Sequence, residues 1–425
     1  MKKLKNYIML FIAMILIFSL GMIFSSLLPN GRIRSHIEES KDILMKSNNN
    51  PLFDNYIIGG KVDDYTDLII MNIAANKGTS ENESPLIKAF ENSIYNNEEG
   101  NQYKSLEETI SNESLYNNAS YARYWHGIQT IVRPLLLVFN YEEIRYLFMI
   151  IMFLLLSITT VGIYENLTIF HALSFVFSML AVCFFIIPAS LQYIGVFAIM
   201  MCAIIIINIL YKKQKLGLLP YVFFVLGGLT TFFDLLTVPM ITLGMPLIIV
   251  ILLKGQQKEN IKELILEIIK LSILWCVSYA TIFFAKWIIA SLILHKNIIK
   301  EAINQIIFRT NGSEEYPTTR LGAIAENFRF LCNNVMVVST VGIAIAWVIA
   351  LIKHRKRFNE IKGVIPLVII AIFPYVWYFV FAGHSIIHAF FTYRLQAIFI
   401  FAVLCAMIEC IDIKKYVKGK IDDER

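Results

Sequence analysis

Long runs of apolar residues, separated by short polar turns, make up most of the chain and predict helices that cross a membrane. A helix needs about 20 predominantly apolar residues to span the hydrocarbon core of a bilayer. Runs of roughly this length occur at ten places in the sequence. They cover residues 7–28, 144–163, 167–187, 193–211, 218–232, a run that ends at 254, 268–294, 335–352, 364–381 and 395–413. The predicted fold class is therefore an all-α polytopic membrane protein with about ten transmembrane helices.

One long polar segment, residues 29–143, interrupts this pattern between the first two runs. Its apolar positions recur at helical spacing over residues 32–46, 66–76 and 85–95, which predicts amphipathic helices. Residues 128–139 are apolar, but a run of about a dozen fits an interfacial or re-entrant segment better than a full crossing. We therefore expect a large first extracytoplasmic loop that is built from amphipathic helices.

Basic residues set the orientation of this arrangement, because cytoplasmic loops are enriched in Lys and Arg. Lysines precede the first run, and basic clusters follow the runs that end near residues 211 and 352. Both termini are therefore expected in the cytoplasm, and the first run, too long for a signal peptide, is expected to stay attached. The predicted parts are an N-terminal transmembrane helix (1–28), the first extracytoplasmic loop (29–143), helices two to seven (144–294), a second extracytoplasmic loop (295–330), helices eight to ten (331–413) and a cytoplasmic tail (414–425).

Composition agrees with a membrane location. The chain is 57% hydrophobic and only 16% charged, whereas soluble domains carry about 25% charged residues. The net charge of +6 follows the basic cytoplasmic loops, so it gives no reason to expect a nucleic-acid partner. The six cysteines include no C-x-x-C pair, so neither a disulfide framework nor a zinc site is expected.

Three carboxylates lie close together in the first loop, in the stretch Lys61-Val-Asp-Asp-Tyr-Thr-Asp67. Asp63, Asp64 and Asp67 stand at the start of a predicted helix, where Asp residues often cap the backbone and favour the helix dipole. One of them is alternatively a general base that accepts a proton from an attacking hydroxyl. They are also suitable ligands for a divalent cation, Mg²⁺ or Mn²⁺, that bridges phosphate groups. The sequence leaves these roles open.

A second group of polar and aromatic residues precedes the interfacial run. Tyr124 and Trp125 suit a membrane interface, but stacking aromatic rings also bind sugars. Arg123 and His126 flank them, and a guanidinium group binds phosphate through two parallel hydrogen bonds. Arg133 lies inside the apolar run and needs an anionic partner, for which a lipid phosphate is one candidate.

The remaining candidates follow later apolar runs. Asp234 stands at a membrane edge, where a charged carboxylate costs free energy, so a function is one interpretation. A turn residue before Pro239 is the other. His384 and His388 are four residues apart and share one helical face, with Arg394 beyond them. No third ligand for zinc is evident, so phosphate binding by Arg394, with the histidines as donors, is more plausible than a metal site. Polar interface residues that simply end a span are the other interpretation.

All of these groups are expected on the outer side of the membrane. The arrangement resembles the GT-C superfamily of membrane glycosyltransferases, in which an acidic motif lies in the first outer loop of a multi-span protein. The chain is also similar to a bacterial multi-span group that shares D-D-Y-T-D, A-R-Y-W-H-G, F-F-D-x-L-T-x-P and H-S-x-I-H-x-F-F-T-Y-R. Here these motifs are residues 63–67, 122–127, 232–239 and 384–394.

The resemblance implies a function at the outer face of the bacterial plasma membrane. It implies a sugar donor linked to polyprenyl phosphate, a glycan, lipid or protein acceptor in the cell envelope, and contact with membrane lipids. One carboxylate of the 63–67 motif would act as base or hold the metal. The residues near the donor phosphate would be Arg123, His126, His384, His388 and Arg394. The alternatives are a transporter or flippase of polyprenyl lipids or polysaccharide, and a non-enzymatic membrane assembly protein.

Overall fold

The computed structural model describes residues 2–46, 59–60, 62–80, 83–112, 115–257, 259–312, 317–356 and 363–412. Within these residues the chain folds into α-helices and short 3₁₀ helices, and the only strand-like pairings are three isolated bridges. The predicted all-α class is therefore confirmed for the described part of the protein. The predicted cytoplasmic tail, residues 414–425, lies outside the described residues.

Seven helices in the described residues are long and apolar enough to cross a membrane, as expected for an α-helical membrane protein. They are built around α1 (Lys2–Leu27), α8 (Tyr141–Asn166), α10 (Leu191–Lys212), α11 (Leu219–Phe233), α13 (Ile261–Leu294), α16 (Asn334–His354) and α21 (Gln396–Glu409). Shorter apolar helices occupy the other three predicted runs. These are α9 (Ile169–Ala181), α12 (Ile241–Gln256) and the pair α17 (Val364–Ala371) and α18 (Phe373–Val380). The total of ten crossings stays a prediction.

The helix predicted over residues 167–187 is shorter than expected, because the backbone conformation changes after Ala181. Helix α9 ends at Ala181, and Cys183 adopts the left-handed conformation with φ of 57°. The chain continues as the 3₁₀ helix η2 (Phe184–Ala189), which contains Pro188. A proline cannot donate the backbone hydrogen bond of a continuing α-helix, so η2 gives the chain an irregular link into α10.

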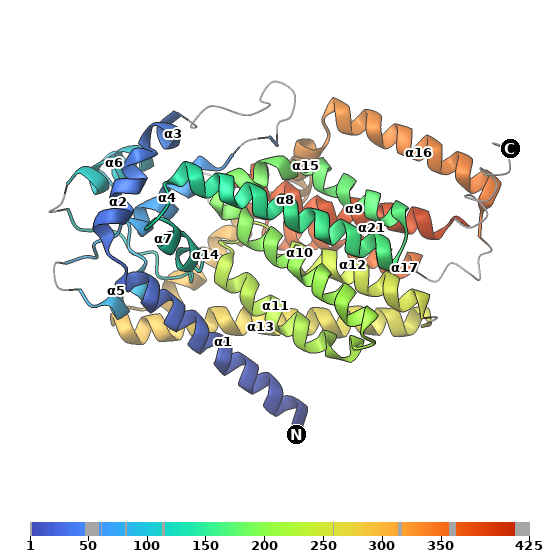
Figure 1. The fold of residues 1–425 in the computed structure, drawn as a ribbon, viewed down its shortest axis with the longest axis horizontal. Helices are drawn as coiled ribbons and strands as arrows, with labels where there is room; N and C mark the ends of the chain where they lie inside the picture. Colours follow the sequence, from blue (N-terminus) through green and yellow to red (C-terminus); the bar gives the residue numbers. More distant parts are fainter. Residues whose placement is uncertain are drawn as a thin grey trace.

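The polar segment between α1 and α8 is also helical. It contains α2 (Asn30–Glu39), α3 (Lys41–Lys46), α4 (Asp64–Ala74), α5 (Pro85–Glu91), α6 (Gln102–Ser111) and α7 (Gln129–Leu135). These helices lie together at one end of the membrane helices (Figure 1). Helix α7 occupies part of the predicted interfacial run, and its Gln129, Val132 and Arg133 side chains are buried.

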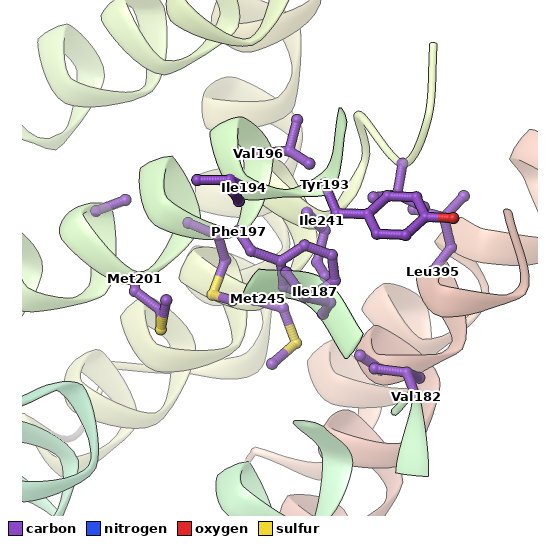
Figure 2. Close-up of a cluster of buried hydrophobic side chains, with 14 of the residues drawn as sticks. Val182, Ile187, Tyr193, Ile194, Val196, Phe197, Met201, Ile241, Met245 and Leu395 are labelled. Atoms are coloured by element: carbon purple, nitrogen blue, oxygen red, sulfur yellow. The ribbon is translucent and has the colours of Figure 1, made fainter. Parts of the chain in front are cut away.

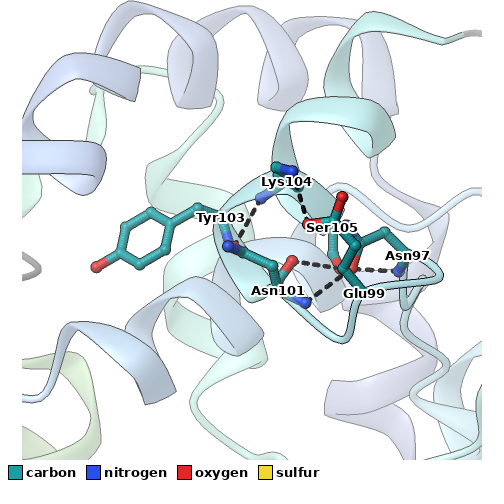
Figure 3. A network of polar contacts seen from close by, with 6 residues as sticks. All are labelled: Asn97, Glu99, Asn101, Tyr103, Lys104 and Ser105. Atoms are coloured by element: carbon teal, nitrogen blue, oxygen red, sulfur yellow. Dashed lines mark hydrogen bonds and ion pairs between the residues drawn. The ribbon is translucent and has the colours of Figure 1, made fainter.

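Asparagine, which is abundant in this segment, starts several of the helices. The Asn101 side chain accepts hydrogen bonds from the backbone N–H groups of Tyr103 and Lys104, which begin α6 (Figure 3). Asn97 in turn accepts from the Asn101 backbone at 2.8 Å. The same kind of cap begins α8, at Asn140, and α13, at Asn260. The asparagines therefore fix helix ends, because a side-chain oxygen satisfies an amide that has no partner within the helix.

The membrane helices pack around a large apolar core. Buried side chains from η2, α10 and α12 meet near its centre (Figure 2). The labelled members there are Val182, Ile187, Tyr193, Ile194, Val196, Phe197, Met201, Ile241, Met245 and Leu395. This core brings the N-terminus of α10, the junction of α11 with α12, and the start of α21 to the end of the molecule where α4 lies.

Helix α16 differs from the other long helices, because none of the residues in its apolar segment is buried. It lies along the outside of the bundle, beside α9 and α21 (Figure 1). Its Trp347 indole nevertheless donates a hydrogen bond of 2.9 Å to the Met407 carbonyl of α21.

Candidate functional site

Asp63 lies at the N-terminus of α4 and caps it. Its carboxylate accepts hydrogen bonds from the Thr66 amide at 3.1 Å and from the Thr66 hydroxyl at 2.7 Å. The side chain is buried, and burial raises the pKa of Asp63 to about 6, although the Thr66 hydrogen bonds and the charge of Arg394 act in the opposite direction. A carboxyl group with such a pKa is largely ionised at neutral pH and still basic enough to accept a proton.

Asp67, one turn further along α4, is fully buried and has a different environment. It accepts hydrogen bonds from the Tyr141 hydroxyl at 2.6 Å and the Leu191 amide at 3.0 Å. The Ser190 hydroxyl at 3.3 Å and the Gln192 amide at 3.4 Å donate to its other oxygen. Asp67 thus occupies the N-terminus of α10, where free amides and the helix dipole favour an anion. Burial nevertheless raises the pKa of Asp67 to about 7.

Asp64 is also buried, in the first turn of α4. Its negative charge acts on Tyr103: burial and the charge of Asp64 together raise the pKa of the Tyr103 phenol to about 12. The three carboxylates that are adjacent in sequence therefore have three different environments.

Arg394 reaches the start of α4 from the far end of the chain, in the short 3₁₀ helix η5 (Tyr393–Leu395). Its guanidinium donates to the Gly59 carbonyl at 3.0 Å and lies 4.4 Å from the centre of the Tyr193 ring. The Tyr393 hydroxyl donates to the same carbonyl at 3.1 Å. A Cβ atom at Gly59 would overlap that hydroxyl, so glycine permits this close approach. The positive charge of Arg394 lowers the pKa of Asp63.

Asp234 connects this region to the junction of α11 and α12. Its carboxylate accepts a hydrogen bond of 2.9 Å from the Thr237 amide, which supports the turn interpretation. The Thr237 hydroxyl accepts one of 3.0 Å from Gln192, the residue whose amide donates to Asp67. Burial raises the pKa of Asp234 to about 7. Asp67 and Asp234 are thus connected through Gln192 and Thr237.

His384 and His388 lie on the other side of that junction, in and after α19 (Ala382–Ile387). Arg309, in α14 (Ile298–Asn311), donates to His384 Nδ1, so His384 Nε2 carries the proton and donates to the Leu236 carbonyl at 2.7 Å. Burial and the charge of Arg309 hold the pKa of His384 well below its usual value and lower that of His388 to about 4. Both imidazoles are therefore neutral at physiological pH.

Arg309 did not stand out from the sequence. It is one cation in a polar loop, and the neighbouring residues do not indicate a role for it, because its partner His384 lies 75 positions away in the sequence.

We refer to the connected set Asp63, Asp67, Asp234, Arg309, His384, His388 and Arg394 as the polar layer. It lies at one end of the membrane helices, beside the first loop.

The segment around Arg123 adjoins the polar layer but has its own partners. Arg123 forms an ion pair of 2.9 Å with Glu301 of α14 and lies 4.3 Å from the centre of the Tyr121 ring. The Trp125 indole donates to the Ile282 carbonyl of α13 at 3.1 Å. Tyr124 is buried in the same apolar cluster as Trp125. These contacts dock the loop onto α13 and α14.

Gly127 attaches this segment to the end of α11, and His126 makes a contact within the segment. His126 lies 3.2 Å from the Tyr121 carbonyl, and burial lowers the pKa of its imidazole to about 3. The Gly127 amide donates to the Phe232 carbonyl at 2.8 Å. A Cβ atom at Gly127 would overlap Phe232, so the two backbones approach closely because residue 127 is glycine.

Arg133 lies outside the polar layer, where it joins the ends of two helices. It donates to the Ser25 carbonyl at 2.9 Å and the Leu28 carbonyl at 3.2 Å, both at the end of α1. It also donates to the Ala74 carbonyl at the end of α4 and to the Asn30 side chain. A cation is favoured at helix C-termini because their last carbonyls have no partner within the helix. The structure therefore gives the guanidinium a connecting role and does not bring it to the other candidates.

The carboxylates offer limited ligation for a metal ion. Among the described residues, no group of three or more His, Cys, Asp or Glu side chains is placed to hold a metal ion. Asp67 already accepts several hydrogen bonds from the protein. Mg²⁺ commonly binds one or two carboxylates together with substrate phosphates. Asp63 and Asp64 fit that smaller requirement.

Several buried polar atoms near the polar layer have no hydrogen-bond partner within the described residues. They are Gln192 Oε1, Tyr193 OH, Arg309 Nε, Ser385 Oγ and Arg394 Nε. Each such atom costs about 1–3 kcal/mol when it is left unsatisfied. In native structures such atoms call for an explanation, and a polar ligand, an ion or ordered water supplies one.

No protein-family model, curated protein or solved structure matches the chain.

Proposed function

We propose that the protein is a GT-C-type glycosyltransferase that moves a sugar from a polyprenyl-phosphate donor to a hydroxyl group of a cell-envelope acceptor. The proposal places the reaction at the outer face of the bacterial plasma membrane, in a ten-span protein with both termini in the cytoplasm. The observation that carries it is the electrostatic effect of Arg394 on the buried carboxylate of Asp63. A buried carboxylate with a pKa of about 6 lies within electrostatic reach of a buried guanidinium that comes from the opposite end of the chain.

Asp63 suits the role of general base better than the other buried carboxylates. Asp67 accepts hydrogen bonds from Tyr141, Leu191 and neighbouring groups that fix helices α8 and α10. Asp234 supports the turn at Thr237. Among the contacts above, the Asp63 carboxylate accepts hydrogen bonds only from Thr66, and the positive charge of Arg394 acts on it. Asp64 is the alternative base.

The reaction begins when the Asp63 carboxylate accepts the proton of the acceptor hydroxyl. The acceptor oxygen forms a bond to the anomeric carbon, and the bond from that carbon to the phosphate oxygen breaks. The electron pair leaves with the polyprenyl phosphate, and the anomeric configuration inverts. Arg394 and Arg309 stabilise the negative charge that develops on the phosphate. The neutral histidines donate hydrogen bonds or orient Arg309.

We include a divalent cation, Mg²⁺ or Mn²⁺, as an optional cofactor of the proposed enzyme. Asp63 and Asp64 would hold it together with phosphate oxygens of the donor. When bound, it would neutralise part of the phosphate charge. The proton transfer assigned to Asp63 needs no metal.

The function is tested with purified protein in proteoliposomes that contain a panel of polyprenyl-phosphate sugars, cell-envelope extract and either Mg²⁺, Mn²⁺ or EDTA. We expect release of polyprenyl phosphate together with a glycosylated product, and we expect loss of both in Asp63→Asn. Asp42→Asn, which removes an exposed carboxylate from the same loop, is the matched control. Movement of an intact labelled donor across the bilayer without product would instead support a flippase. Absence of both activities with every donor would favour an assembly protein.

A further inference from the structure

Helix α16 is attached to the bundle at both ends and by the Trp347–Met407 hydrogen bond between them, and an apolar space remains between the helix and the bundle. At one end it follows α15 (Arg320–Leu331) and begins at the Asn333 cap. At the other end, residues 354–356 pair with residues 410–412: the Lys356 amide donates to the Cys410 carbonyl at 3.0 Å, and the Asp412 amide donates to the His354 carbonyl at 2.8 Å. The distance between α16 and α21 is therefore fixed by the fold.

An apolar groove runs along the inner side of α16 between these two attachments. One stretch, with a volume of 520 Å³, is lined by α9, α16 and α21 and reaches Ile411 beside the paired end. A second stretch of 320 Å³ continues toward Cys332 at the other end. The stretches share Phe177, Ile343, Leu404 and Met407, so they form one continuous groove.

The width of the groove limits what it can hold. The Trp347 indole of α16 reaches the Met407 carbonyl of α21 at 2.9 Å. A helix of a partner protein is about 10 Å across, so it does not fit between α16 and α21 at this point. A single hydrocarbon chain is thin, has no polar groups to satisfy and matches an apolar lining. A lipid chain is consequently the occupant that fits.

The charge at the paired end indicates the kind of lipid. Lys353 and Arg355 are exposed there, one turn beyond Ala350, which lines the groove. Lys356 lies beside them and contacts Glu409 at 3.5 Å, and His171 contacts the other oxygen of Glu409 at 3.7 Å. Basic residues next to a crevice between transmembrane helices attract anionic lipid headgroups. A zwitterionic headgroup would gain less from the same contacts.

We propose that this groove binds one chain of an anionic phospholipid whose phosphate group lies at Lys353 and Arg355. The site is separate from the polar layer, which lies at the other end of the bundle, and it does not depend on the glycosyltransferase proposal. The lipid would fill the space that α16 leaves open and hold this helix in place.

The test is native mass spectrometry of the protein released from nanodiscs of phosphatidylglycerol or phosphatidylcholine, with thermal unfolding measured in both. We expect a retained phosphatidylglycerol molecule and a higher melting temperature in that lipid. Lys353→Gln/Arg355→Gln should lose about fivefold in affinity for the anionic lipid for each charge removed. Lys213→Gln/Lys215→Gln, which removes two exposed charges at the end of α10, should keep the preference.

A groove-filling variant tests the chain separately from the headgroup. Ala346→Trp should lose the retained lipid, whereas Ile345→Trp, on the exposed side of α16, should keep it. Circular dichroism confirms that each variant is folded, and if Ala346→Trp does not fold, the charge variants decide. Equal retention and melting in both lipids, retention by Ala346→Trp, or cross-linking of residue 346 to another polypeptide would overturn the proposal.

Discussion

The first turn of α4 and the segment from Tyr121 to Gly127 both combine charged and aromatic side chains, yet they are built differently. Around Arg123 the cation has a carboxylate partner at 2.9 Å, and the Trp125 indole has a carbonyl partner. Around Asp63 the cation whose charge acts on the carboxylate is Arg394, and its guanidinium donates to the carbonyls of Gly59 and Phe390. The comparison shows that residue type alone does not separate a structural contact from a ligand site; the partners do.

The largest effect is expected from Asp63→Asn. Loss of a general base lowers a rate by about 10²–10⁴-fold, whereas Asn caps a helix nearly as well as Asp, so the loss of stability should stay below about 1 kcal/mol. Transfer rate and thermal unfolding of the same preparation measure both quantities. If the rate falls only in proportion to the fraction of folded protein, Asp63 serves only as a helix cap. The two regions would then not differ in function.

Asp67→Ala should act on stability. The substitution leaves the Tyr141 hydroxyl and the amides at the start of α10 without an acceptor, at a cost of about 3 kcal/mol or more in the free energy of unfolding. Tyr141→Phe, which removes one donor, should cost about 1 kcal/mol. Denaturant titration measures the series. If the Asp67→Ala protein has normal stability and no transfer activity, Asp67 is the general base and the stabilising role assigned to it is wrong.

The pH dependence of transfer follows from the pKa of Asp63. A base must be ionised, so the rate should rise with pH through about 6. It should be about tenfold lower at pH 5 than at pH 7.5. Removing the positive charge in Arg394→Gln disfavours the ionised carboxylate and should move this limb to higher pH. A pH–rate profile of both proteins checks the shift, and an unmoved limb would mean that Arg394 does not act on the base.

The smallest effects are expected from the Arg123–Glu301 pair. The side chains are 18% and 35% exposed, and ion pairs with this access to solvent contribute about 1 kcal/mol or less. A double-mutant cycle with Arg123→Gln and Glu301→Gln measures this coupling. Transfer should change by less than about threefold, since the pair serves the scaffold. Loss of transfer in a stable Arg123→Gln protein would instead place Arg123 in the donor site.

The apolar pattern was sufficient to predict the fold class. A bilayer offers no hydrogen bonds to the backbone, so long apolar runs must become helices, and seven such helices are present in the described residues. The early end of α9 was not predictable in the same way, because it depends on the left-handed backbone at Cys183. Helix α6 was missed because its apolar side is short and its start depends on the Asn101 cap.

The roles of individual polar residues depended on distant partners. The sequence grouped Asp63 with Asp67, but the amides that bind Asp67 lie more than 120 positions away at the start of α10. Arg133 was expected to have an anionic partner, with a lipid phosphate as one candidate, whereas the structure places helix-end carbonyls around its guanidinium. Arg309 had no local signal at all. Residue type identified the candidates, and only the tertiary contacts separate the members of the polar layer from the scaffold.

The contact between Arg394 and the Gly59 carbonyl joins residues 335 positions apart. A ribosome has therefore synthesised every residue up to position 394 before the guanidinium reaches this region. Every shorter nascent chain contains the Asp63 carboxylate without the Arg394 cation. In the proposed enzyme, catalysis consequently begins only after residue 394 has been added, and a premature stop codon anywhere before position 394 yields an inactive protein.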